Sequence, residues 1–295
     1  MLKLTQPEIA ARNKANNRAQ YDALPGLNQS TARLFRRSIA HGDAALKVER
    51  NPSPAMILGT LVHKAVLEPT DWSTYYAVPA DAPGRPSDRL RNAKKPSPET
   101  VEAIKYWDDL FNRHGDRLVD ADTHKTTEDI AASVRRAMDD YGIVPLATEV
   151  ALCADFGIPI KGSLDLITED GVIFDIKTTS ASATRDDWGR DLERDPDLAL
   201  QVAWYSLLFR ENFGSVPTAF RHIVVETKAP YAVQVFEADE EIKARGVELM
   251  LAAIDRYRAY QAGIAEGLKY LPAYPVEVIK VSPWKPAAAN NSLQF

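Results

Sequence analysis

The residues with the clearest chemical potential are two acids and a lysine near the middle of the chain. Asp175 and Lys177 interrupt the apolar run GVIFDIKTTS, and Asp165 stands ten residues before Asp175 in KGSLDLIT. A carboxylate and an ammonium inside a buried strand are costly unless each has a partner or a function. Side chains alternate between the two faces of a strand, so Asp175 and Lys177 point the same way.

A short turn around Asp170 folds the strand of Asp165 back beside the strand of Asp175. Each of the two acids lies five residues from Asp170, so they can face one another across the hairpin. Glu149, in LATEVAL one strand earlier, adds another carboxylate. Acids this close raise each other's pKa, and a divalent cation removes the penalty. Oxygen ligands suit Mg²⁺ or Mn²⁺, which lower the pKa of a bound water and make it a nucleophile; Lys177 can position or deprotonate that water or neutralise the transition state.

A plainer alternative is a hairpin with solvated acids and a single ion pair between Asp175 and Lys177. An isolated D-x-K triplet occurs often by chance. The triplet here lies in an apolar strand, one turn after a strand with its own Asp165. This context favours the metal site.

The surrounding segments predict an α+β fold: a mixed β-sheet flanked by helices, with a helical N-terminal region. Short turns join three strand-like segments between residues 146 and 178, which predicts an antiparallel meander. The apolar stripe of SPAMILGTLVHKAVLEP predicts a helix over 53–69. Further helices are expected at 98–113, 125–141, 196–212 and 239–266, and further strands at 72–78, 219–226 and 231–237, with a loop over 79–100.

The chain divides into three expected parts. Residues 1–145 form a mainly helical N-terminal part, 146–270 the sheet-centred core and 271–295 a C-terminal tail, all in one compact domain. The net charge of −5 does not suggest a protein that coats nucleic acid. The single cysteine excludes disulfide frameworks and four-cysteine metal sites within one chain. With no signal peptide or membrane-length apolar stretch, we expect a cytoplasmic protein without a membrane partner.

These motifs resemble the PD-(D/E)-x-K nuclease superfamily, with Asp165, Asp175 and Lys177 as its signature. More narrowly, the chain looks like the RecE-type (exonuclease VIII-like) exonucleases of phages and prophages. GTLVHKAVLEP matches the Gly-Thr-x-x-His motif with His63, TEVAL supplies Glu149, and VVETKAPYAV resembles the next strand pair. QVAWY matches the Q-x-x-x-Y helix motif of RecB-like nucleases through Gln201 and Tyr205. The resemblance runs from about residue 28 to 265.

The resemblance implies a restriction-endonuclease-like core and a Mg²⁺- or Mn²⁺-dependent exodeoxyribonuclease. Such an enzyme degrades linear double-stranded DNA 5′ to 3′ and leaves 3′ overhangs for recombination. The implied partners are double-stranded DNA ends, further copies in a trimeric or tetrameric ring, and a single-strand annealing recombinase. Alternatives are a RecB-like or restriction-type endonuclease or nickase, and a catalytically silent DNA-binding subunit.

Carried over by position, the resemblance makes Asp165, Asp175 and the Ile176 backbone carbonyl metal ligands, with Lys177 serving the water. It also places His63 at the metal, although the residues alone favour a hydrogen-bonded core histidine. Glu149 is either a ligand, direct or through water, or a solvated strand residue.

Other candidates keep two interpretations each. Gln201 and Tyr205 share a helix face, where they orient Lys177 or contact a phosphate, or else simply pack beside Trp204. Thr178 and Thr179 can donate to the DNA backbone or simply favour a strand end. Basic residues that could bind phosphate, or be merely solvated, stand on an N-terminal helix and in the 79–100 loop: Arg33, Arg36, Arg85 and Arg89.

Overall fold

The computed structural model describes residues 2–48 and 51–265. The helices are α1 (Gln6–Arg12), α2 (Arg18–Ala23), α3 (Gln29–Arg37), α4 (Ile39–Lys47), α5 (Pro54–Leu67), α6 (Pro69–Trp72), α7 (Asp88–Arg91), α8 (Pro98–His114), α9 (Ala121–Asp140), α10 (Arg185–Arg194), α11 (Pro196–Phe213) and α12 (Glu240–Ala265). The strands are β1 (Leu27–Asn28), β2 (Tyr76–Val78), β3 (Leu118–Asp120), β4 (Ala147–Asp155), β5 (Pro159–Ile167), β6 (Val172–Thr179), β7 (Ala219–Glu226) and β8 (Val233–Glu237).

The main sheet is mixed, as the sequence predicts. Strands β4, β5 and β6 form the expected antiparallel meander, β7 runs parallel to β6, and β8 pairs antiparallel with β7. One edge of β5 pairs along its length with β4. Its other edge is shared: β1 pairs with its start and β6 with its end. Between these two pairings the middle of β5 lacks a strand neighbour on that side, and the acidic residues gather beside it.

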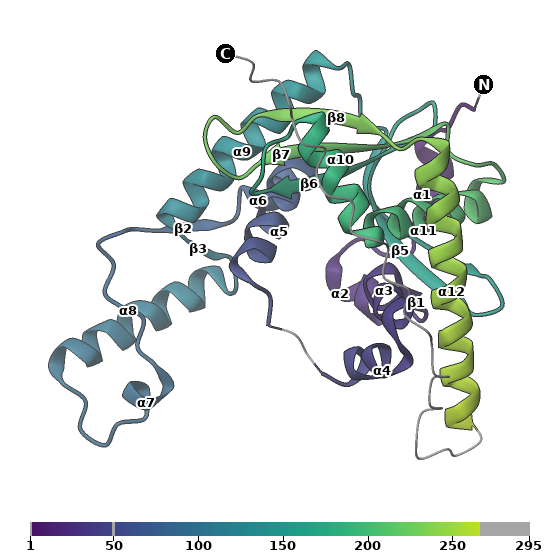
Figure 1. The fold of residues 1–295 in the computed structure, drawn as a ribbon. Helices are drawn as coiled ribbons and strands as arrows, with labels where there is room; N and C mark the ends of the chain where they lie inside the picture. The colour runs from purple at the N-terminus through teal and green to yellow at the C-terminus, as the bar shows by residue number, and fades with distance from the viewer. Residues whose placement is uncertain (1, 49–50, 266–295) are drawn as a thin grey trace, which may run out of the picture.

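Helices cover both faces of the sheet (Figure 1). On one face α11 packs over β4 and β5, and α12 packs on α11 and α3. On the other face α5 and α9 enclose a second core with β6 and β7. Val172, Phe174 and Ile176 of β6 belong to this second core, whereas Ile173 belongs to the first. The predicted alternation along β6 is therefore confirmed.

The N-terminal residues share the first core with the sheet. Leu4, Ile9 and Phe35 pack in the same buried cluster as Trp204 of α11. Buried Lys161 of β5 ties α2 down, because its ammonium donates to three backbone carbonyls between residues 21 and 24 at 2.7–3.0 Å. The proposed divisions at 145 and 270 stay predictions, and the tail at 271–295 lies outside the described residues.

Some local expectations are wrong. The predicted strand 72–78 is the end of helix α6 followed by the short strand β2, because Pro69 begins a helical turn. Helix α10 was not predicted; its four acids and three bases in ten residues give it little apolar patterning. The expected 79–100 loop contains α7. With α8, this segment forms an arm between β2 and β3 that projects from the body (Figure 1). Within the described residues, no helix is long and apolar enough to span a membrane.

Candidate active site

The site begins where β5 and β6 separate. Their backbone ladder pairs Ile167 with Ile173 and Leu166 with Phe174. The ladder stops there, so Asp165 and Asp175 are not paired through their backbones. Instead, the Ile176 backbone N–H donates to Asp165 Oδ2 at 2.8 Å. The carboxylate of Asp165 thus replaces a ladder acceptor, which fixes its position between the two strands.

Glu149 enters the site from β4 through an unusual backbone conformation. Thr148 pairs with Leu166 and Val150 with Leu164, but the step between them, where Glu149 faces Asp165, is skipped. Glu149 has a φ of 50°, in the left-handed region that non-glycine residues seldom adopt. Its Oε2 accepts a hydrogen bond from Ser163 Oγ at 3.1 Å. The interruption of the ladder turns the Glu149 side chain toward the gap beside β5.

Helix α5 brings His63 to the same point. His63 Nε2 donates to the Ile176 carbonyl at 2.9 Å, and its Nδ1 lies 3.4 Å from Asp165 Oδ2. Gly59, one helical turn earlier, faces the same way, and a Cβ there would come within 3.3 Å of Thr178 Oγ1. The spacing of Gly59 and His63 therefore allows α5 to approach the end of β6 closely.

His63, Glu149 and Asp165 form a candidate metal centre, with one ligand atom from each lying within 4.8 Å of the others. Burial, reinforced by the charge of Asp175, raises the pKa of Asp165 to about 8. Burial and then Asp165 raise the pKa of Glu149 to about 7. Burial also lowers the pKa of His63, which favours the neutral imidazole that metals bind. The donor set of two carboxylates and one imidazole fits a divalent cation such as Mg²⁺ or Mn²⁺, which would offset this crowding of acids.

Asp175 stands next to this centre and has other partners. Its Oδ1 accepts from Gln201 Nε2 at 2.9 Å, and Lys177 Nζ lies 2.5 Å from its Oδ2 without the angles of a good hydrogen bond. The side chain of Asp175 is almost fully buried, while Lys177 is half-buried. The ion pair of the plainer alternative is thus present together with the acidic centre. The structure brings Asp165 and Asp175 together as neighbours, but the group within 4.8 Å contains Asp165 and not Asp175.

Helix α11 supplies Gln201 and Tyr205 from above the sheet. Trp204 Nε1 donates to the Lys161 carbonyl of β5 at 3.1 Å, and this hydrogen bond holds α11 against the sheet. Gly162 makes the approach possible, since a Cβ there would lie 3.0 Å from the Tyr205 ring. Burial and then the charge of Asp175 raise the pKa of Tyr205 well above its usual value, so the phenol keeps its proton. Gln201 binds Asp175, and a role of Gln201 or Tyr205 toward Lys177 or a phosphate stays a prediction.

The residues expected to contact DNA lie in three different places. Thr178 and Thr179 continue β6 beyond Lys177, with half-buried side chains. Arg36 forms an ion pair of 2.8 Å with buried Asp197, which joins α3 to the start of α11. Arg33, on the same helix, is half-buried, and its Nε has no hydrogen-bond partner among the described residues. Arg89 is in α7 and Arg85 precedes that helix, so both belong to the projecting arm, and both are exposed.

Sequence reasoning missed two neighbours of the acids. Ser163 lies two residues before Asp165, and this spacing could have indicated a shared strand face. His222 has no motif around it in the sequence, but it pairs with Asp175 in the parallel β6–β7 register. It is buried, and burial lowers its pKa to about 4, so a neutral imidazole lies beside Asp175 at neutral pH. No local signal in the sequence reveals such a long-range pairing.

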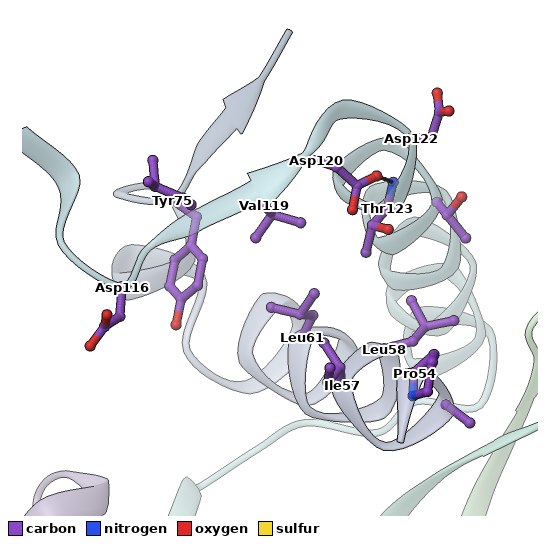
Figure 2. A pocket seen from close by; sticks show the side chains of 13 residues that line it. Pro54, Ile57, Leu58, Leu61, Tyr75, Asp116, Val119, Asp120, Asp122 and Thr123 are labelled. Carbon is purple, nitrogen blue, oxygen red and sulfur yellow. Dashed lines mark hydrogen bonds between the residues drawn. The ribbon is translucent and has the colours of Figure 1, made fainter. Parts of the chain in front are cut away.

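A cavity of about 730 Å³ lies elsewhere, between α5, β3 and the start of α9. Figure 2 shows Ile57 and Leu61 of α5 facing Val119 and Tyr75 across it. With 3.6 residues per turn, this face of α5 is opposite to His63. Acids line part of the rim, including Asp116, Asp120 and Asp122. This cavity combines an apolar floor with an acidic rim, and its lining includes none of His63, Glu149 and Asp165.

The mixed sheet, the acids of β5 and β6 and the lysine that follows define a PD-(D/E)-x-K-type core. The model of a family described as a PDDEXK-like domain of unknown function (DUF3799) matches residues 29–268, and the chain belongs to this family. No curated protein matches. A crystal structure of a candidate exonuclease from Eubacterium rectale is similar to this fold, with a TM-score of 0.52, 13% identity, and coverage of 85% of this chain and 91% of that one. A phage-related exonuclease from Haemophilus somnus 129PT matches with a TM-score of 0.34, 15% identity, and coverage of 65% and 97%.

Proposed function

We propose that the protein is a Mg²⁺-dependent exodeoxyribonuclease that degrades linear double-stranded DNA from 5′ to 3′ and leaves 3′ overhangs. The observation that carries the proposal is the group of His63, Glu149 and Asp165, whose ligand atoms lie within 4.8 Å of one another beside Asp175 and Lys177. Three acids near a lysine stabilise a fold poorly but suit phosphodiester hydrolysis. The exonuclease descriptions of the two similar structures agree with this class of reaction.

The roles of the side chains follow from their contacts. His63, Glu149 and Asp165 would hold the cation, with Asp175 and the Ile176 carbonyl beside them. When bound, a divalent cation supplies a Lewis acid that stabilises negative charge on the attacked phosphate and promotes ionisation of water. Gln201 Nε2 donates to Asp175 Oδ1 at 2.9 Å, and this hydrogen bond keeps the carboxylate of Asp175 directed at Lys177.

Lys177 shares a strand face with Asp175, and its ammonium reaches the edge of the centre. From there it can donate to a phosphate oxygen, where charge develops as the bond between water and phosphorus forms and the P–O3′ bond breaks. Neutral His222 lies beside Asp175 without adding charge. Lys177 therefore stabilises the transition state, whereas Gln201 positions Asp175.

A digestion assay tests the proposal. Linear duplex and covalently closed circular DNA are incubated with the protein in Mg²⁺ or in EDTA. We expect Mg²⁺-dependent loss of the linear DNA alone, blocked by phosphorothioate linkages at the 5′ ends and not at the 3′ ends. Asp175→Asn should abolish digestion, whereas Asp155→Asn, which removes an exposed carboxylate at the end of β4, should not.

Other outcomes identify the alternatives. Cutting of closed circles would indicate an endonuclease or nickase, and DNA binding without cleavage in any divalent metal would indicate a silent subunit. A ring of three or four copies and an annealing recombinase partner complete the proposal. Light scattering of the purified protein tests the ring, with a monomer at assay concentration as the contrary result.

A further inference from the structure

The arm between β2 and β3 is held by few contacts with the rest of the molecule. Its long helix α8 buries only Ala103 and Leu110, and α7 buries no residue. In Figure 1 the arm extends away from the main sheet, and α7 lies at its far end. Such a limited core does not explain why the chain builds a projection of this length.

The end of the arm is strongly basic. Residues 85–95, which we call the basic tip, contain Arg85, Arg89, Arg91, Lys94 and Lys95 and a single acid, Asp88. The whole chain has a net charge of −5. Positive charge is therefore concentrated at the basic tip of an otherwise acidic protein.

Two of these cations hold the tip together. The Arg85 guanidinium lies 4.5 Å from the ring centroid of Phe111 on α8, and Arg91 forms an ion pair with Asp108 on the same helix. Trp107 adds a hydrogen bond from its Nε1 to the Pro83 carbonyl at 2.8 Å. These contacts fix the basic tip on α8 and consume the charge of Arg91.

The other three cations have no such use. Arg89, Lys94 and Lys95 are exposed, and none forms an ion pair with a residue in the ranges 2–48 and 51–265. Three unpaired like charges within seven residues repel one another. A polyanion would turn that repulsion into binding energy.

We infer that Arg89, Lys94 and Lys95 of the basic tip bind backbone phosphates of duplex DNA at a distance from the cleavage site. The inference rests on the proposed function, which makes duplex DNA the substrate. Figure 1 shows α7, which carries Arg89, at the far end of the arm and away from the main sheet. Phosphate contacts at that place hold the duplex and carry no sequence information.

The test measures binding separately from cleavage. A fluorescein-labelled duplex of about 40 base pairs is titrated with protein in EDTA, at salt concentrations between about 50 and 200 mM. Fluorescence anisotropy gives the dissociation constant at each salt concentration. Each phosphate contact adds about 0.9 to the slope of log K against log salt, so R89A/K94A/K95A should lower the slope by about 2.7. Over this salt range the wild type should then lose about 40-fold more affinity than the variant.

Two matched variants make the result specific. R89K/K94R/K95R keeps the charges and should keep the wild-type slope. K14A/K47A/R245A removes three exposed cations from other elements and should also keep it. An unchanged slope in R89A/K94A/K95A, or an equal fall in K14A/K47A/R245A, would overturn the inference.

Light scattering on the same samples covers the remaining alternative. If R89A/K94A/K95A changes the mass of the assembly and leaves the salt slope intact, the basic tip binds another copy of the chain and the inference is wrong. Because binding is measured in EDTA, a chain that binds DNA through the tip but never cleaves it would refute the proposed function alone. Cleavage with an unchanged salt slope would refute the inference alone.

Discussion

Glu149 and Asp165 face one another at a step where the β4–β5 ladder is interrupted, and Glu149 has a φ of 50° there. A left-handed conformation costs a residue with a Cβ about 1–2 kcal/mol. The carboxylate that this conformation presents also carries a pKa raised to about 7. Backbone strain and acidic crowding thus coincide at the residues that would bind the cation, as is common at functional sites.

The strain at Glu149 predicts a trade between stability and metal binding. Glu149→Gly should raise the free energy of unfolding above that of Glu149→Gln by about 1 kcal/mol, because glycine adopts this φ without a Cβ clash. Both variants should bind Mn²⁺ more weakly than the wild type, since each lacks the carboxylate. Urea denaturation and calorimetric titration measure the two quantities. A glycine variant less stable than the glutamine variant would show that the φ of 50° is not strained.

Cation binding should release protons in a pH-dependent manner. The pKa values of about 8 for Asp165 and about 7 for Glu149 mean that both carboxyls are largely protonated at pH 6 without metal and ionised at pH 9.5. A cation binds the ionised forms, so protons must leave at the lower pH. Titrating Mn²⁺ in two buffers of different ionisation enthalpy should give one to two protons released at about pH 6 and almost none at about pH 9.5. Equal release at both pH values would contradict the raised pKa values.

The same two carboxyls should make the metal-free protein less stable as the pH rises. Their pKa values are raised in the folded state, so the folded chain binds more protons than the unfolded chain, and stability falls as the pH rises through about 7 and 8. Thermal melts in EDTA should therefore show a falling Tm between about pH 6.5 and 9. The double amide variant Glu149→Gln/Asp165→Asn should lose much less over this range. An equal fall in the Tm of the wild type and the double variant would show that other groups cause the pH dependence.

Close packing of α11 on β5 predicts a coupled pair of substitutions. A Cβ at Gly162 would lie 2.6 Å from Leu208 Cδ1, so Gly162→Ala should cost about 1–3 kcal/mol of unfolding free energy. Leu208→Ala alone should also destabilise, by about 2–5 kcal/mol, because Leu208 is fully buried. In the double variant the methyl group that Gly162→Ala introduces enters the space that Leu208→Ala vacates. The double variant should therefore lose less unfolding free energy than the sum of the losses in the two single variants. Strict additivity in urea denaturation would show that these two residues do not compete for space.

Local sequence patterns predicted the heart of the site. The alternation along β6 and the short turn at Asp170 were enough to place Asp165 beside Asp175, because neighbouring strands joined by a tight turn have a defined register. The apolar stripe predicted helix α5, and the four-residue spacing of Gly59 and His63 gives them one face of it. The resemblance to a nuclease family, and not this geometry, brought His63 to the metal centre as an expectation.

Long-range pairings could not be predicted in this way. The parallel neighbours β6 and β7 are separated by α10 and α11, so the position of His222 beside Asp175 depends on a crossover that leaves no periodic signal. The left-handed φ of Glu149 was hidden because nothing in LATEVAL resembles a bulge. The 79–100 segment of the arm was expected to be a loop, since the charges of the basic tip conceal the single turn of α7, whereas helix α8 was predicted.

The central claim is that the centre of His63, Glu149 and Asp165 performs metal-dependent hydrolysis of DNA. Single-turnover cleavage of an end-labelled linear duplex in Mg²⁺, compared between the wild type and Asp165→Asn, tests it most directly. Circular dichroism first establishes that the variant is folded. Loss of the carboxylate should lower the rate at least about 100-fold, as for other groups that stabilise transition-state charge. If the folded Asp165→Asn variant cleaved at the wild-type rate, or if the wild type cleaved in EDTA, the central claim would be wrong.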